Sequence, residues 1–108
     1  MPQIKIRGVE TENIRKVSNQ LIDDLAQLTQ SPKDDFTLEV MNSTFIQNGE
    51  IVPGYPFVEV AWFDRGQKLQ DLVAQTITRL INEAGYPSVD IMFTILEKSR
   101  YYENGKHY

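Results

Sequence analysis

The stretch PFVEVAWFDRGQKLQDLVAQTITRLINEAGYPSVDIMFTIL, residues 56–96, decides the fold of this chain. Over residues 58–62, large apolar side chains alternate with a glutamate and an alanine, a pattern typical of a strand with one buried face. From 67 to 84 the apolar residues recur every three or four positions, which predicts an amphipathic helix that ends before Gly85 and Pro87. Alternation returns at the end of the stretch, which therefore predicts a strand–helix–strand unit.

The first half of the chain follows the same plan. Its strand, helix and second strand are predicted over residues 4–7, 11–29 and 36–41. Adding 54 to the residue number carries Pro2 onto Pro56, whereas adding 55 aligns the two helices and carries Phe36 onto Ile91. Any two amphipathic units align partly by chance, but prolines also stand before three of the four strands. We therefore interpret the match as a duplication.

A duplication gives one domain over residues 1–108, with pseudo-repeats at approximately 2–41 and 56–96. Because each crossover connection is right-handed, both helices lie on the same face of a four-stranded mixed sheet. We predict the α+β class, as a two-layer sandwich of duplicated βαβ units. The apolar side chains expected on the helix-covered face are Ile4, Ile6, Phe36, Leu38, Val58, Val60, Ile91 and Phe93.

The opposite face of the predicted sheet carries charges of both signs. Lys5 and Arg7 lie on its first strand, with Glu39 and Glu59 on neighbouring strands. Two interpretations stay open. The face is solvated, as is common in two-layer α+β domains, or these charges form ion pairs inside an oligomer, where an unpaired charge is costly.

Two short segments are predicted to form β-ribbons. Asn-Gly pairs at residues 48–49 and 104–105 interrupt apolar-sided runs at residues 45–52 and 100–108, and Asn-Gly is a strong hairpin signal. Ribbons that project from a small domain present unpaired strand edges, and a neighbouring subunit is one natural cover for them.

The composition excludes several classes of function. The chain has 11 basic and 15 acidic residues, a net charge of −4, which argues against nucleic-acid binding. No apolar run approaches a membrane span, and the N-terminus lacks the pattern of a signal peptide, so we expect a cytoplasmic protein. The chain has no cysteine, a single histidine (His107) and no glycine-rich phosphate loop. We therefore expect it to bind neither a metal nor a cofactor.

Pro2 is the residue best suited to carry chemistry. Removal of Met1 leaves a secondary amine at the start of the first strand. An α-amino group has an ordinary pKa of about 7.7 to 8.0, and partial burial beside a cation lowers it. A neutral amine near physiological pH is matched to general-base catalysis, and its protonated form returns the proton as a general acid. The corresponding Pro56 has an amide nitrogen and no basicity.

These features resemble the tautomerase superfamily, which includes 4-oxalocrotonate tautomerase and macrophage migration inhibitory factor. The N-terminal Pro2, the doubled plan and the length carry this resemblance, which covers the whole chain. The runs FTLE (36–39), YPFVEVAWFDRGQ (55–67) and YYENG (101–105) are similar to an uncharacterised bacterial branch of it. The resemblance implies a homotrimer in which the N-terminal proline acts on a small acidic substrate, an α-keto acid or its enol.

Topology predicts three neighbours for Pro2. Parallel strands begin at the same edge, which brings Lys33 towards Pro2, and an antiparallel third strand brings Phe63 and Arg65. A guanidinium suits a substrate carboxylate and a developing enolate, and Phe63 would form an apolar wall. Both cations also fit a solvated surface, and Asp64 is an alternative partner for Arg65 or an N-cap of the second helix.

We therefore predict a tautomerase or isomerase in which Pro2, once Met1 is removed, transfers a proton between carbon and oxygen of a keto or enol carboxylate. A tyrosine and an asparagine on the last strand of better-known relatives correspond to Asp90 and Met92. These replacements remove expected substrate contacts. The alternative is accordingly a non-catalytic binding or assembly module with the same fold.

Overall fold

The computed structural model describes residues 2–108; Met1, whose removal the catalytic hypothesis requires, lies outside the described residues. The elements in chain order are β1 (Gln3–Arg7), α1 (Thr11–Thr29), the 3₁₀ turn η1 (Lys33–Asp35), β2 (Thr37–Met41), β3 (Phe45–Gln47), β4 (Glu50–Val52), β5 (Phe57–Phe63), α2 (Gln67–Glu83), β6 (Asp90–Leu96), the 3₁₀ turn η2 (Lys98–Arg100), β7 (Tyr102–Glu103) and β8 (Lys106–His107).

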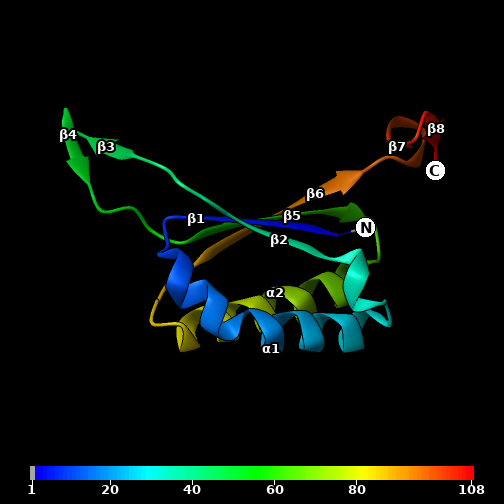
Figure 1. The fold of residues 1–108 in the computed structure, drawn as a ribbon, viewed down its shortest axis with the longest axis horizontal. Helices are drawn as coiled ribbons and strands as arrows, with labels where there is room; N and C mark the ends of the chain where they lie inside the picture. The colour runs from blue at the N-terminus through cyan, green and yellow to red at the C-terminus, as the bar shows by residue number, and fades with distance from the viewer. Residues whose placement is uncertain (1) are drawn as a thin grey trace.

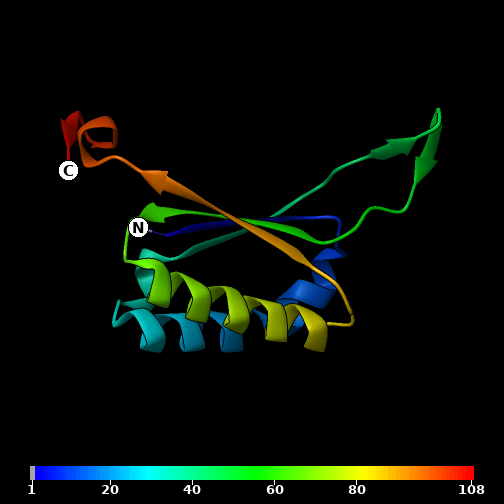
Figure 2. The ribbon, with the colours of Figure 1, turned by 180° about the vertical axis from the view of Figure 1, so that it is seen from behind.

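The central sheet has the strand order β2-β1-β5-β6. β1 is parallel to β2 and antiparallel to β5, and β5 is parallel to β6. Both helices lie on one face of this sheet, side by side, as Figures 1 and 2 show from opposite sides. The predicted α+β sandwich of two βαβ units with a mixed four-stranded sheet is therefore confirmed.

The core fills the space between the sheet and the helices. β1 and β5 contribute their alternate residues, and each helix contributes one apolar face. The fully buried side chains of this core are Ile4, Ile6, Ile14, Leu21, Leu25, Val58, Val60, Trp62, Val73, Ile77, Leu80 and Ile81. Phe36, Leu38, Ile91 and Phe93, predicted on the same face, are partly buried against it, because the last three lie on the two outer strands and Phe36 directly precedes one of them.

The strand register corrects one part of the predicted repeat. Ile4 pairs with Leu38 and Val58 pairs with Ile91, so Leu38 corresponds to Ile91 with an offset of 53 rather than 55. The helix ends keep the offset of 55. The Ser31 N–H bonds to the Ala26 carbonyl, and 55 residues later the Tyr86 N–H bonds to the Ile81 carbonyl near the end of α2. The first half therefore has two extra residues between helix and strand, in the segment that contains the η1 turn.

Both predicted ribbons are present. Asn48 and Gly49 turn from β3 to β4 with φ of 54° and 77°, and Asn104 and Gly105 turn from β7 to β8 with φ of 53° and 86°. Positive φ at both central residues is the geometry that favours Asn-Gly in two-residue hairpins. The ribbons extend beyond the helices at opposite ends of the sheet (Figure 1).

The uncovered sheet face keeps its charges separate within this chain. Among the described residues, neither Lys5 nor Arg7 forms an ion pair with Glu39 or Glu59. The Arg7 guanidinium instead lies 4.3 Å from the centre of a β5 phenyl ring, and Glu59 accepts a hydrogen bond from a β6 threonine. Of the helices in residues 2–108, none is long and apolar enough to cross a membrane.

Candidate functional site

Pro2 is buried at the start of β1, where three other segments meet. Its carbonyl accepts a hydrogen bond from the Thr37 N–H at 3.2 Å, which joins it to the beginning of β2. Gln3 pairs with Ala61 of β5, so the antiparallel register places Pro2 opposite Trp62. By strand alternation Pro2 lies on the helix-covered side of the sheet. The site is thus at the ends of the strands, between the end of α1 and the beginning of α2.

Two nitrogen atoms in this region lack partners. The indole Nε1 of Trp62, a side chain only 1% exposed, and the Nε of Arg65 are buried without a hydrogen-bond acceptor among the described residues. The Arg65 guanidinium lies 5.5 Å from the Trp62 ring, and its Nη1 donates a long 3.4 Å bond to the Ser31 hydroxyl. In residues 2–108 Arg65 forms no ion pair. A buried unsatisfied donor costs about 1–3 kcal/mol, so this pair of nitrogens calls for an explanation.

The beginning of α2 adds positive potential beside Arg65. Gly66 is the N-cap residue, has no side-chain cap, and is followed by a first turn without an acidic residue. The expected N-cap role of Asp64 is wrong, because φ of 89° at Gly66 makes the glycine the last non-helical residue. The Asp64 carboxylate instead accepts the Gly66 N–H at 2.9 Å. Helix N-termini favour anions.

The C-terminal ribbon contributes an aromatic cluster on the other side of β5. The Phe63 ring centre lies 5.5 Å from that of Tyr101 and 5.4 Å from that of Tyr108. Gln3 donates to the Tyr101 hydroxyl at 3.4 Å, so the cluster contacts the residue next to Pro2. Phe63 was predicted as a neighbour of Pro2, whereas Tyr101 and Tyr108 were not, because only the folding back of the ribbon brings them there.

Tyr108 holds this ribbon closed. Its hydroxyl donates a 2.6 Å hydrogen bond to Glu103, and its N–H bonds to the Tyr101 carbonyl at 3.0 Å. The hydrogen bond to the Glu103 carboxylate, together with burial and the negative charge, raises the pKa of Tyr108 to about 12. The phenol therefore stays a neutral donor at physiological pH.

Lys33, the third predicted neighbour, is held on the surface of α1. Its ammonium lies 2.7 Å from the Asp23 carboxylate, and its side chain is 66% exposed. The hydrogen bond and the charge of Asp23 raise the pKa of Lys33. Its role at Pro2 stays a prediction, and in this structure its partner is a helix carboxylate.

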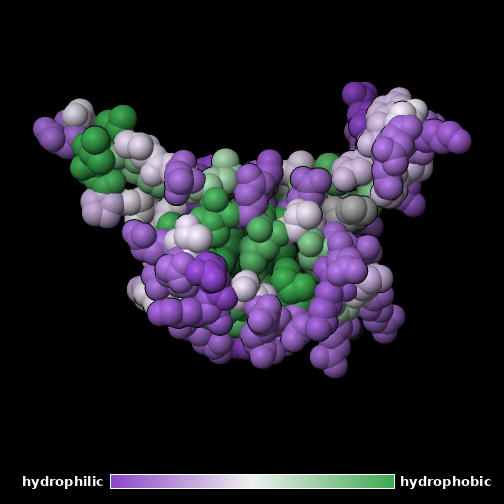
Figure 3. Space-filling view, in the orientation of Figure 1, coloured by the Kyte–Doolittle hydropathy of each residue, from purple (hydrophilic) through white to green (hydrophobic). Residues whose placement is uncertain are grey.

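A groove lies elsewhere on the molecule, between α1 and the outer strand β2. It measures about 760 Å³, and Lys33 stands on its rim. Its floor is formed by the apolar side chains of Ile14, Ile22, Leu38 and Val40. Figure 3 shows this apolar surface as a green band between the sheet and the helix.

Residues 1–107 match the family described as "Domain of unknown function (DUF1904)". The chain belongs to this family. A crystal structure of a member from Sebaldella termitidis is 36% identical in sequence and superposes with a TM-score of 0.92. The match covers 100% of this chain and 100% of that one. No match was found among curated proteins.

Other similar structures belong to the tautomerase superfamily. The macrophage migration inhibitory factor-like protein of Entamoeba histolytica has a TM-score of 0.71 at 14% identity, covering 99% of this chain and 98% of that one. Fused 4-OT, described as an asymmetric trimer, has a TM-score of 0.68 at 13% identity, covering 97% and 94%. At such identities the likeness establishes the fold alone, which this chain shares with these tautomerase-superfamily proteins.

Proposed function

We propose that this protein is a tautomerase in which the amine of Pro2 transfers a proton between carbon and oxygen of a small keto or enol carboxylate. The observation that carries the proposal is the position of Arg65, a half-buried arginine without a carboxylate partner among residues 2–108, at the strand ends where Pro2 lies. Arg65 binds the substrate carboxylate, and burial of Pro2 disfavours its charged form. Phe63, the apolar wall expected from the sequence, lies with the ribbon tyrosines at the same strand ends but on the other side of β5 from Trp62.

The test uses the two corresponding prolines. The intact mass of untagged protein first establishes that Met1 is absent. The rate of ketonisation of phenylenolpyruvate is then followed by ultraviolet absorbance for the wild type, Pro2→Ala and Pro56→Ala. Positioned general-base catalysis contributes about 10²–10⁴-fold. We expect Pro2→Ala to lose about 10²-fold, at the low end because its primary amine still accepts a proton.

Pro56→Ala is the matched control because Pro56 is also buried and also accepts a backbone bond at the start of a strand. Its rate should stay within a few-fold of the wild type, with circular dichroism used to show that both variants fold. Equal rates for wild type and Pro2→Ala would contradict proline catalysis.

One observation favours the second candidate, a non-catalytic binding module. A groove of about 760 Å³ between α1 and β2 includes Ile14, Ile22, Leu38 and Val40 in its lining and lies away from Pro2. If the wild type shows no turnover of phenylenolpyruvate or 2-hydroxymuconate although Met1 is absent, this candidate takes precedence.

We also propose that the protein is a homotrimer. The β3–β4 ribbon carries Ile46 and Ile51 as a cross-strand pair with 69% and 78% exposure, and exposed apolar pairs of this kind mark contact surfaces. Sedimentation of the wild type should give three times the mass of the 12.5 kDa chain. Ile46→Lys with Ile51→Lys should lower the association, whereas Glu50→Lys on the same ribbon should not. A wild-type mass of 12.5 kDa alone would contradict the trimer.

A further inference from the structure

The two halves of the molecule differ where each helix ends. The Ser31 and Tyr86 N–H groups form the same bond, to the carbonyls of Ala26 and Ile81 at 3.0 and 3.2 Å, so these residues occupy corresponding positions. The tyrosine hydroxyl accepts hydrogen bonds from the Glu10 N–H at 2.8 Å and from an asparagine side chain at 2.9 Å. It therefore fills the space before the opposite helix.

At the Pro2 end the corresponding side chain is a serine. The Arg65 guanidinium reaches the hydroxyl of this serine, Ser31, at 3.4 Å. The hydrogen-bond donors in the two halves also differ in whether they have an acceptor. The Glu10 N–H has an acceptor in the tyrosine, whereas the nitrogens Nε1 of Trp62 and Nε of Arg65 have none among the described residues.

We propose that Nε1 of Trp62 and the Arg65 guanidinium together bind one carboxylate of the ligand. This inference rests on the proposed function, which supplies an anionic ligand near Pro2, and it adds the indole as a residue that binds and orients it. A carboxylate has two oxygen atoms and accepts up to four hydrogen bonds. It satisfies both orphaned donors at once.

Arg65 is the group that moves when the ligand enters. Both nitrogens are covered in the free chain, so a ligand reaches them only after a covering side chain is displaced. The contacts of Arg65 are weak: the one hydrogen bond that its guanidinium forms within residues 2–108 is 3.4 Å long, and its guanidinium lies 5.5 Å from the indole ring centre. Trp62, by contrast, is fixed in the core against Phe93, with ring centres 5.1 Å apart. The indole is the rigid donor and the guanidinium the adjustable one.

The experiment exploits the fact that Trp62 is the only tryptophan, so the protein gives a single indole N–H signal in a heteronuclear NMR spectrum. The probe is benzoylformate, a keto carboxylate with no enolisable hydrogen, which binds without reacting. We expect a saturable downfield shift of the indole proton on titration. The uncharged methyl ester of the probe should produce no such shift.

Variants assign the shift to the two donors. Arg65→Gln should weaken binding about tenfold or more, as expected for loss of a charge-assisted hydrogen bond. Arg15→Gln is the matched control, because it removes the same charge from an exposed site on α1. Trp62→Phe, followed by calorimetry, should weaken binding several-fold. An indole signal that does not move at saturating probe, or equal affinities for Arg65→Gln and Arg15→Gln, would overturn the proposal.

The outcome is separable from that of the proposed function. Pro2→Ala should retain the indole shift with its rate of ketonisation lowered. A shift without turnover in the wild type would leave the carboxylate site in place and remove the tautomerase, whereas turnover without a shift would do the reverse.

Discussion

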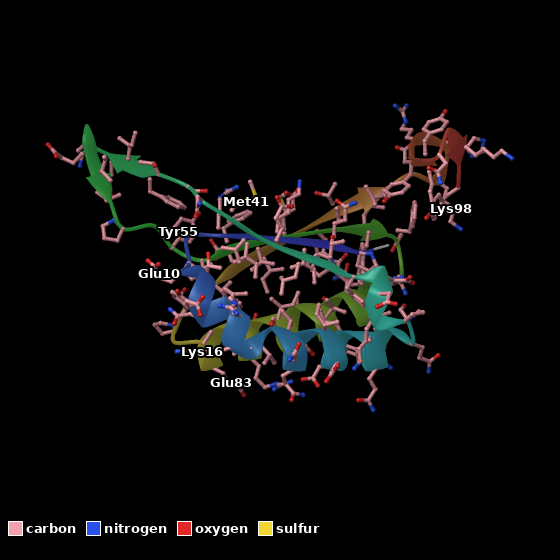
Figure 4. All side chains as sticks on the ribbon, in the orientation of Figure 1. Glu10, Lys16, Met41, Tyr55, Glu83 and Lys98 are labelled. Atoms are coloured by element: carbon pink, nitrogen blue, oxygen red, sulfur yellow. The ribbon has the colours of Figure 1, made fainter. Side chains whose placement is uncertain are left out.

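At both ends of the sheet a buried proline precedes a central strand, and a ribbon extends beyond the helices. Opposite Pro56, however, the register places Gly8, whereas opposite Pro2 it places Trp62. In Figure 4, Tyr55 and Glu10 mark the Pro56 end, and Lys98 lies near the ribbon at the Pro2 end. The Pro56 end is closed by the Tyr55 backbone, which packs on Gly8. The Pro2 end is closed by the Arg65 side chain, whose contacts are weak.

In the proposal made above, two similar βαβ units keep the same architecture while only one of them would bind a ligand. The Pro56 end satisfies its polar groups within the chain, through Tyr86. The Pro2 end leaves two donors unsatisfied and a cation without a partner among the described residues, which lowers stability until a ligand supplies the acceptor. The contrast between the two ends can be tested by measuring how substitutions at each end change the free energy of unfolding.

The largest effect is expected at Gly8. A Cβ there would lie 1.9 Å from the Tyr55 carbonyl oxygen, and the residue has φ of 77°. Because the obstacle is backbone, Gly8→Ala should lower the free energy of unfolding by about 3 kcal/mol or more, the sum of overpacking and left-handed backbone strain.

Gly66→Ala is the matched variant at the Pro2 end. Gly66 has φ of 89° and ψ of 154°, a region that essentially only glycine occupies, but a Cβ there meets nothing within 4 Å, so the cost is the backbone strain of about 1–3 kcal/mol. Urea unfolding measures both. If Gly66→Ala cost as much as Gly8→Ala, the Pro2 end would be as tightly closed as the other end, and the comparison would fail.

Much of this architecture could be predicted from the sequence because it depends on local patterns. Alternation and helical spacing gave the strands and helices to within one or two residues, and Asn-Gly gave both ribbons. The predicted alignment of β2 with β6 at an offset of 55 was wrong by two residues, because the segment with the η1 turn (Lys33–Asp35) adds residues without changing the alternation. The period of the apolar residues indicates on which face of the sheet a residue lies, but not how long the preceding loop is.

The candidate site was less predictable. Arg65 and Phe63 follow from counting along antiparallel strands, so the sequence places them at the strand ends. Tyr101 depends on a ribbon folding back, which is a tertiary event. The orphaned nitrogen of Trp62 depends on which acceptors surround it, and no sequence pattern reports an absent acceptor.

A smaller effect is expected where the helices end. Tyr86→Phe leaves the Glu10 N–H and the Asn13 amide without their acceptor. It should lower the free energy of unfolding by about 1–2 kcal/mol, the range for a lost helix cap. Ser31→Ala removes two long bonds at the Pro2 end, one accepted from Arg65 at 3.4 Å and one donated to the Thr29 carbonyl at 3.3 Å. Because both bonds are long, it should change stability by less than about 0.5 kcal/mol. Thermal and urea unfolding distinguish the two, and a Ser31→Ala cost equal to that of Tyr86→Phe would mean that Arg65 is firmly held.

The smallest effect is confined to the ribbon at the Pro2 end and to high pH. The pKa of Tyr108 is about 12 in the folded chain, above its ordinary value of 10, because its hydroxyl donates to the Glu103 carboxylate. Since the folded state binds this proton more tightly, the stabilisation is fully present below pH 10 and is lost as the pH rises through about 12. Near-ultraviolet titration should show one tyrosine ionising late, and its absence in Tyr108→Phe assigns it.

Glu103→Gln removes the charge of the acceptor and should return this ionisation towards pH 10, whereas Glu97→Gln, which breaks only a neighbouring exposed ion pair, should leave it unchanged. Once ionised, Tyr108 repels Glu103 and the ribbon opens from Phe63, so the fluorescence of Trp62 should change over the same pH interval. If the fluorescence stays constant while the tyrosine titrates, the ribbon does not cover the Pro2 end, and the closure of that end depends on Arg65 alone.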